Sequence, residues 1–155
     1  MSLATEIRFL QAQPLFSGLD PVRLEVLAFT AARQQYEAGA TVFMQGSQAD
    51  AAYLITSGEA VLLDHDASGQ ARARRVDAGD LIGENALFKS EIWRASLRAV
   101  TPIEMLRISR DMFHRLMGEF PEMAGQIAAT IADRLEDIGQ ALAGLGKKHG
   151  EKEKQ

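Results

Sequence analysis

The segment Gly83-Glu84-Asn85-Ala86-Leu87 combines residue types that could bind an anion. Gly83 would let the backbone approach a ligand closely, because glycine has no side chain. A short helix that begins at Glu84 would leave its first N–H groups without intrahelical acceptors, and such groups bind phosphates and carboxylates. The same glutamate has a plain structural interpretation, as a first-turn acid favoured by the helix dipole. We expect an anion-binding turn at residues 83–87.

Other kinds of site find little support in the residue types. The chain has no cysteine, which excludes disulfides, thiolate nucleophiles and cysteine-bound metals. Its three histidines, His65, His114 and His149, lie on different segments, so a histidine metal site of the small β-barrel enzymes is not expected. No serine, histidine and aspartate set accompanies a nucleophile-elbow motif. We predict a protein that is not an enzyme and holds neither metal nor cofactor.

The composition is that of one ordinary globular domain. Hydrophobic residues make up 46% of the 155 residues and charged residues 25%, which suffices for a core without disulfides. Seventeen basic and 21 acidic residues leave a net charge of −4, so no large positive field attracts nucleic acid. No apolar run approaches the roughly 18 residues that span a bilayer, and Glu6 and Arg8 interrupt any signal peptide. We expect a cytoplasmic protein that binds neither DNA nor membrane.

Helical patterns precede and follow a glycine-punctuated middle. A short helix is expected over Glu6–Gln11, and a second after Asp20, a capping residue that Pro21 follows at the first helical position. Between about residues 33 and 108, glycines separate short apolar runs of strand length. This pattern predicts a mainly β fold with flanking helices, an antiparallel β-roll of the jelly-roll type.

The C-terminal part, about residues 109–145, is expected to be helical, with Ser109 as an N-cap and a break at Pro121. A heptad seam of apolar residues then follows: Ala128, Ile131, Leu135, Ile138, Leu142 and Leu145. The seam either packs on its own roll or pairs with a second copy, and its narrow width favours a homodimer through residues 121–145. We assign residues 1–146 to one domain and expect a disordered, charged tail at 147–155.

Four motifs, in their order along the chain, resemble the cyclic-nucleotide-binding domains of catabolite-activator-type proteins, kinase regulatory subunits and gated channels. These are Pro14–Leu19, Gly39–Gly46, Tyr53–Gly58 and Gly79–Glu84. The resemblance covers about residues 3–145 and implies a regulatory module that binds cAMP or cGMP and signals through a homodimer to a separate protein effector. Activators of this type append a DNA-binding domain after the long helix; here the chain ends ten residues past Leu145, so no direct DNA binding is expected.

The resemblance also implies ligand contacts. Gly83, Glu84, Asn85 and Ala86 match the opening of the family's phosphate-binding cassette, in which Glu84 accepts from the ribose 2′-hydroxyl. On the long helix, Arg134 resembles an arginine that closes over the ligand, and the alternative is a solvated residue at the flank of the seam. The next positions, where nucleotide-responsive activators contact adenine, hold Ile138 and Gly139, which lack hydrogen-bonding side chains.

The phosphate arginine of the family has no simple match. Counting back from Ala99 places Trp93 there, whereas counting forward from Gly83 reaches Arg94 if the loop is longer. Strand alternation favours the first count, with Trp93, Ala95, Leu97 and Ala99 facing inward and Arg94, Ser96 and Arg98 outward. A bulge near Arg94 would turn its guanidinium inward, so Arg94, Ala95 and Ser96 are predicted ligand contacts. The alternative is a degenerate domain that has lost the nucleotide and serves as a dimerising interaction protein.

Overall fold

The computed structural model describes the backbone of residues 2–153 and the side chains of residues 2–144. The chain begins with α1 (Leu3–Gln11), the 3-10 turn η1 (Pro14–Phe16) and α2 (Pro21–Thr30). The strands are β1 (Ala32–Tyr36), β2 (Thr41–Phe43), β3 (Gln48–Ala49), β4 (Ala51–Ser57), β5 (Glu59–His65), β6 (Ala71–Asp77), β7 (Leu81–Ile82), β8 (Glu91–Ile92), β9 (Ser96–Ala99) and β10 (Ile103–Ser109). A second 3-10 turn, η2 (Glu84–Leu87), separates β7 from β8, and α3 (Arg110–Glu119) and α4 (Pro121–Glu153) end the chain.

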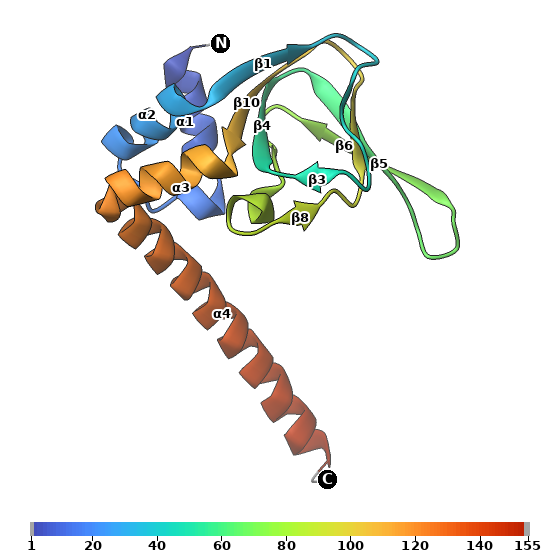
Figure 1. The fold of residues 1–155 in the computed structure, drawn as a ribbon. Coiled ribbons are helices and arrows are strands. Elements are labelled where there is room, and N and C mark those ends of the chain that lie inside the picture. The colour runs from blue at the N-terminus through green and yellow to red at the C-terminus, as the bar shows by residue number, and fades with distance from the viewer. Residues whose placement is uncertain (1, 154–155) are drawn as a thin grey trace.

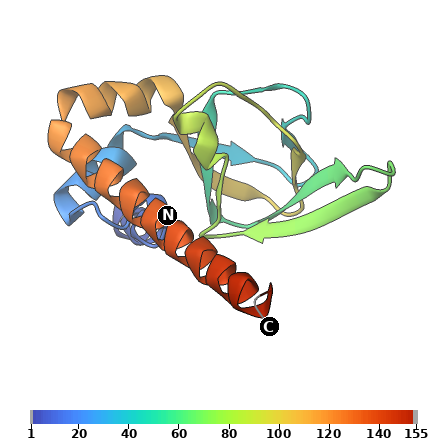
Figure 2. The ribbon, with the colours of Figure 1, turned by 90° about the horizontal axis from the view of Figure 1, so that it is seen from below.

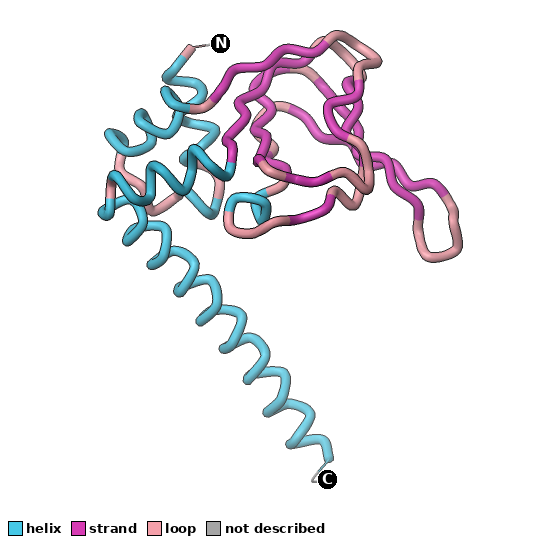
Figure 3. Tube along the Cα trace, in the orientation of Figure 1, coloured by secondary structure: helices cyan, strands magenta, loops and turns pink. Residues whose placement is uncertain are grey.

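Antiparallel strands form the roll seen on the right of Figure 1. One sheet has the order β1-β10-β4-β7, a second has the order β2-β9-β5-β6, and β3 pairs with β8. The helices gather on one side of the roll (Figure 3), and the β5–β6 hairpin projects from the other side. The predicted mainly β fold, an antiparallel roll with flanking helices and a long C-terminal helix, is confirmed.

Strand β4 is the wall that two apolar cores share. Its side chains alternate between the two faces of the sheet, as those of any strand do. Ala52 and Leu54 join the cluster formed by the helices, whereas Tyr53 and Ile55 join the cluster inside the roll. Because both faces of β4 are buried, the helices and the roll interior are held against the same strand, next to η2.

Both predicted helix caps are confirmed. The Asp20 carboxylate accepts a hydrogen bond from the Arg23 N–H at 3.0 Å, and this bond is the main reason why the pKa of Asp20 lies below its ordinary value. The Ser109 hydroxyl accepts from the Met112 N–H at 3.1 Å and starts α3 directly after β10. Side-chain oxygens at these two positions satisfy N–H groups that the first helical turn leaves without acceptors.

Helix α4 changes its surroundings along its length. Met123 and Ile127 are buried among the helices, whereas Leu135, Ile138 and Leu142 are 64%, 56% and 62% exposed. Figure 1 shows this second part of α4 standing away from the rest of the chain, and in Figure 2, seen from below, α4 runs in front of the N-terminal helices. The exposed residues belong to the predicted heptad seam, and the side chain of Leu145 lies outside the described residues.

The helix reaches further than the sequence pattern suggested. The backbone is helical to Glu153, across most of the segment predicted as a disordered tail, and residues 154–155 lie outside the described part. Lysine and glutamate are good helix formers, which agrees with a helical backbone over the charged residues after Gly146. Within residues 2–153, no helix combines the length and apolar character needed to cross a bilayer.

Candidate ligand-binding site

A cavity of about 520 Å³ opens between η2, the segment that joins β8 to β9, and α4. We call it the Glu84 cavity. Its lining residues are Phe43, Ala49, Leu62, Leu81, Ile82, Gly83, Glu84, Asn85, Ala86, Glu91, Ile92, Trp93, Arg94, Ala95 and Arg134. The predicted contacts Gly83, Glu84, Asn85, Ala86, Arg94, Ala95 and Arg134 are therefore brought together, although they come from distant parts of the chain. The predicted contact Ser96 is not among the lining residues.

The predicted short helix after Gly83 is present as the 3-10 turn η2. Gly83 has a φ of +85°, a left-handed conformation that residues with a Cβ rarely adopt. The Ala86 N–H donates to the Gly83 carbonyl at 2.9 Å, whereas the N–H groups of Glu84 and Asn85 have no acceptor among the described residues. The turn thus has two amide donors without acceptors at residues that line the cavity.

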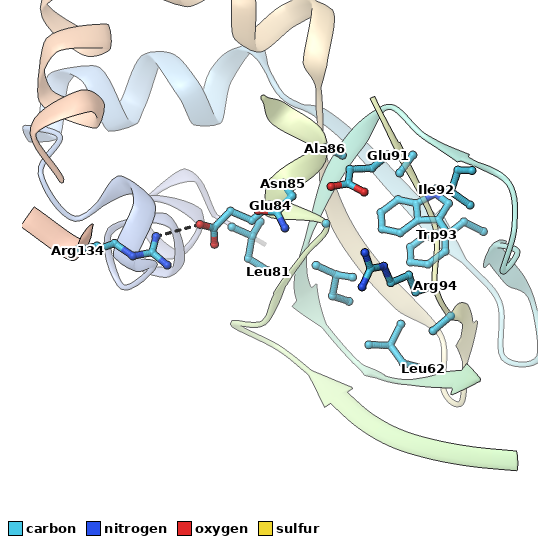
Figure 4. Close-up of a pocket in the computed structure, with 15 residues that line it drawn as sticks. Leu62, Leu81, Glu84, Asn85, Ala86, Glu91, Ile92, Trp93, Arg94 and Arg134 are labelled. Carbon is cyan, nitrogen blue, oxygen red and sulfur yellow. Dashed lines mark hydrogen bonds and ion pairs between the residues drawn. The ribbon is translucent and has the colours of Figure 1, made fainter. Parts of the chain in front are cut away.

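An ion pair crosses the mouth of the cavity. Arg134 of α4 donates from Nη1 to Oε1 of Glu84 at 3.0 Å, as the dashed line in Figure 4 marks. The two side chains are 47% and 32% exposed, respectively. Both residues were predicted site residues, but nothing in the sequence linked them to each other. A ligand hydroxyl that donates to Oε1 of Glu84 would compete with Arg134, whereas Oε2 forms no hydrogen bond with any described residue.

Trp93 occupies the interior position that the strand count predicted. It is 9% exposed and stacks on Phe43, with ring centroids 3.7 Å apart and an interplanar angle of 7°. The backbone N–H of Trp93 donates to the Ser47 carbonyl at 2.9 Å, and the backbone carbonyl of Trp93 accepts from the Gly46 N–H at 2.8 Å. A Cβ on Gly83 would clash with the indole ring. Trp93 therefore fills the space directly beneath the start of η2.

Arg94 lines the cavity, contrary to the outward orientation that strict alternation predicted. The chain bends at residues 94–95, and β9 begins only at Ser96, so alternation does not apply there. Figure 4 shows the guanidinium pointing into the cavity, next to Trp93. Arg94 forms no hydrogen bond or ion pair with any described residue. Ser96 instead uses its hydroxyl to accept from the Gln45 N–H at 2.8 Å.

The charges of the lining residues leave one cation uncompensated. Glu84 is paired with Arg134, and Glu91 lies 3.5 Å from the ammonium group of Lys89. Among the described residues that line the Glu84 cavity, Arg94 is therefore the positively charged residue that no carboxylate neutralises. A guanidinium beside two free amides is a donor set suited to an anion such as a phosphodiester.

Several lining residues were not singled out from the sequence. Phe43, Leu62 and Leu81 form an apolar wall, and Glu91 adds a carboxylate. The inward faces of β2 and β5 follow from alternation, so a period of two residues could have identified Phe43 and Leu62. No local pattern marks Glu91, whose position depends on the pairing of β8 with β3.

The comparisons with known proteins agree with this architecture. Residues 33–120, more than half of the chain, match the family model of the cyclic nucleotide-binding domain. The cAMP-dependent protein kinase regulatory subunit of Aspergillus fumigatus is 37% identical over 110 residues, which are 71% of this chain and 26% of that protein. The cGMP-dependent protein kinase egl-4 of Caenorhabditis briggsae is 31% identical over 117 residues, 73% of this chain and 16% of that kinase.

A solved structure extends the match to the flanking helices. The N-terminal domain of a transcriptional regulator from Streptomyces coelicolor A3(2) superposes with a TM-score of 0.79 at 26% identity, covering 86% of this chain and 94% of that domain. The chain thus corresponds to about a quarter or less of the two kinase-related proteins but to nearly all of this regulator domain. It belongs to the cyclic nucleotide-binding domain family, a family of regulatory and generally non-catalytic modules.

Proposed function

We propose that the chain binds a cyclic nucleotide in the Glu84 cavity and signals through a homodimer to a separate protein effector. The phosphodiester binds between the Arg94 guanidinium and the free amides of Glu84 and Asn85. The ribose 2′-hydroxyl donates to the Glu84 carboxylate, and Arg134 closes the mouth of the cavity from α4. The single observation that carries the proposal is that Arg94, which is exposed and whose guanidinium has no partner among the described residues, lines the same cavity as Glu84 and Asn85, whose amides are free.

Arg94 takes the role of the phosphate cation because Trp93 cannot. The register of the strand puts Trp93 at the interior position, where an indole has only one N–H and no charge. The bend at residues 94–95 brings the next side chain to the same cavity. Charge-assisted hydrogen bonds are about twice as strong as neutral ones, so a single arginine contributes much of the anion affinity.

Calorimetric titration with cAMP and with cGMP tests this assignment. Arg94→Ala should weaken binding of both nucleotides at least about tenfold, since a charge-assisted pair contributes about 1.5–3 kcal/mol. Arg98→Ala is the matched control, because Arg98 lies on β9, is exposed and does not line the cavity. An unchanged affinity in the Arg94 variant would remove this residue from the site.

A second function is favoured by one specific observation. Trp93 stacks on Phe43 and excludes any side chain at Gly83, so the interior beneath η2 is filled with aromatic carbon. A domain with that interior could keep the fold and the dimer seam while binding no nucleotide, and act as an interaction protein. The absence of heat with either nucleotide up to millimolar concentration would favour this function over the first.

The homodimer is inferred from the seam of α4. Leu135, Ile138 and Leu142 repeat at heptad spacing and are more than half exposed in the single chain. Three such side chains on one face of a helix gain most of their burial from a second copy of the same face. Arg134 lies next to Leu135, so a ligand that displaces Arg134 from Glu84 acts on the helix that forms the dimer. The effector and the predicted cytoplasmic location stay predictions.

A further inference from the structure

Arg110, the first residue of α3, bonds three backbone carbonyls at once. Its Nη1 donates to the carbonyl of Lys89 at 2.8 Å, of Ala86 at 3.3 Å and of Ala49 at 3.4 Å. No carboxylate of the described residues forms an ion pair with Arg110. The backbone N–H of Arg110 donates to the Asp50 carbonyl at 2.8 Å, which fixes the start of the side chain. The charge of Arg110 is thus directed at the backbone of η2 and its neighbours.

His114 makes a further bond to η2 from the next turn of α3. Its Nε2 lies 2.9 Å from the Leu87 carbonyl oxygen, and since a carbonyl only accepts, Nε2 carries the hydrogen. Residues four positions apart share one face of a helix, so Arg110 and His114 lie side by side. The Phe113 ring also meets the Phe88 ring edge to face, with centroids 5.6 Å apart. This face of α3 therefore holds the carbonyl end of η2.

The turn η2 needs such support from outside. It has only four residues, and the hydrogen bonds of a 3-10 turn have poor geometry. The Gly83 carbonyl accepts from the Ala86 N–H at 2.9 Å. Because the peptide unit is planar and trans, the Glu84 N–H points opposite to the Gly83 carbonyl. The direction of this N–H thus depends on Ala86, whose own carbonyl is bonded to Arg110.

Building on the proposed function, we propose that Arg110, assisted by His114, is a positioning residue that fixes η2 in the orientation in which it binds the ligand. Arg110 does not line the Glu84 cavity and acts through the turn. Glu84, Asn85 and Ala86 are consecutive lining residues, so a rotation of the turn would move all three. A turn that is already ordered before binding leaves a smaller ordering cost to the ligand and gives a higher affinity.

Calorimetric titration of the full chain and its variants with cAMP and with cGMP tests this role. Arg110→Met keeps a long side chain without donors and should weaken binding of both nucleotides at least about tenfold. Arg110→Lys should restore the affinity to within about threefold of the unmodified chain, because an ammonium group offers three donors to the same carbonyls. Arg115→Met is the matched control and should change nothing, since Arg115 lies on the same helix, is exposed and does not line the cavity.

His114→Ala provides a milder variant, because His114 is exposed and its removal leaves the core intact. It deletes one hydrogen bond to η2 and should weaken binding about threefold. Urea denaturation shows whether each variant is folded, and His114→Ala carries the test if Arg110→Met does not fold.

A second measurement needs no ligand. The NMR amide signals of Glu84 and Asn85 in the free chain report the orientation of η2. They should shift or broaden in Arg110→Met and return toward their original positions in Arg110→Lys. A merely structural role of Arg110 would lower the free energy of unfolding and leave these two signals, and the affinity of the folded chain, unchanged.

The outcomes separate this inference from the proposed function on which it rests. Unchanged amide signals or unchanged affinity in Arg110→Met, or an equal loss in Arg110→Lys, would overturn the role of Arg110 and leave nucleotide binding in place. Where Arg110→Met does not fold, an unchanged affinity in His114→Ala would do the same. No binding of either nucleotide by the unmodified chain would overturn the proposed function, and the amide signals alone would then decide whether Arg110 positions η2.

Discussion

The two sides of the Glu84 cavity are held by different kinds of contact. On the roll side, Trp93 is 9% exposed, stacks on Phe43 and excludes any side chain at Gly83. On the α4 side, the contact is one ion pair between Glu84 and Arg134, whose side chains are 32% and 47% exposed. Partly exposed pairs contribute about 0–1 kcal/mol, whereas a buried aromatic side chain contributes several times more. The roll side is therefore a fixed template, and under the proposed function the α4 side is the one that we expect a ligand to displace.

The largest effect is expected from removing the aromatic part of the template. Trp93→Ala should lower the free energy of unfolding by about 3–5 kcal/mol, because it deletes a buried ring and leaves a hole beneath η2. Ile92→Ala is the matched control: Ile92 is 60% exposed, and the change should stay within about 0.5 kcal/mol. Urea denaturation of both variants measures the difference. Similar losses of unfolding free energy in the two variants would mean that Trp93 is packed no more tightly than the exposed Ile92.

The next effect isolates the contact between η2 and Trp93. Gly83→Ala and Gly69→Ala both place a Cβ at a positive φ, which costs roughly 1–2 kcal/mol. At Gly69 the new methyl group meets nothing within 4 Å, whereas at Gly83 it clashes with the Trp93 ring. Gly83→Ala should therefore lose at least about 1 kcal/mol more than Gly69→Ala. Equal losses in thermal denaturation would contradict a close packing of the turn on the template.

On the α4 side, the exposed seam should matter for association and hardly at all for the single chain. Leu135→Glu should abolish self-association in sedimentation velocity, because it puts a charge at the centre of the seam. The stability of the monomer should change by less than about 0.5 kcal/mol, since Leu135 is 64% exposed. Gln140→Glu introduces the same charge away from the seam residues and should leave association unchanged. Dimers in the Leu135 variant would show that another surface pairs the chains.

The smallest effect is expected from the ion pair itself. Arg134→Ala should change the free energy of unfolding by less than about 1 kcal/mol, because both partners are partly solvated. High salt should weaken the ion pair in the unmodified chain, so the free energies of unfolding of the variant and the unmodified chain should become more similar. Chemical denaturation at low and high salt provides the comparison. A loss above about 2 kcal/mol would place the α4 side among the fixed parts of the cavity.

The same contrast explains which features the sequence could predict. The caps at Asp20 and Ser109 and the glycine-separated strands are local patterns, and the structure has both. Of the predicted seam, Leu135, Ile138 and Leu142 are exposed on α4, and its pairing with a second copy stays a prediction.

The turn after Gly83 also follows from a short motif. Alternation is reliable inside a strand and identifies Leu97 and Ala99 of β9 as interior positions. Trp93 precedes the bend at residues 94–95, so its burial agrees with the count but does not follow from alternation alone.

Features that depend on distant segments were beyond this kind of reasoning. The bend at Arg94 breaks alternation, and its direction depends on how β8 pairs with β3. Glu84 and Arg134 are 50 positions apart in the sequence, so no local sequence pattern predicts their ion pair. On β6, Arg72 and Arg75 are paired whereas Arg74 has no partner among the described residues, and the three look alike in the sequence because the carboxylate partners come from strand register.

Trp93 gives the most direct test of the central claim, that a cyclic nucleotide binds in the Glu84 cavity next to Arg94. It is the single tryptophan of the chain and lines the cavity, so its fluorescence reports on that site alone. Titration with cGMP should produce a saturable change in emission that persists in Arg98→Ala and shifts at least about tenfold to higher concentration in Arg94→Ala. A saturable change with the same midpoint in Arg94→Ala, or calorimetric binding without any change in emission, would contradict it.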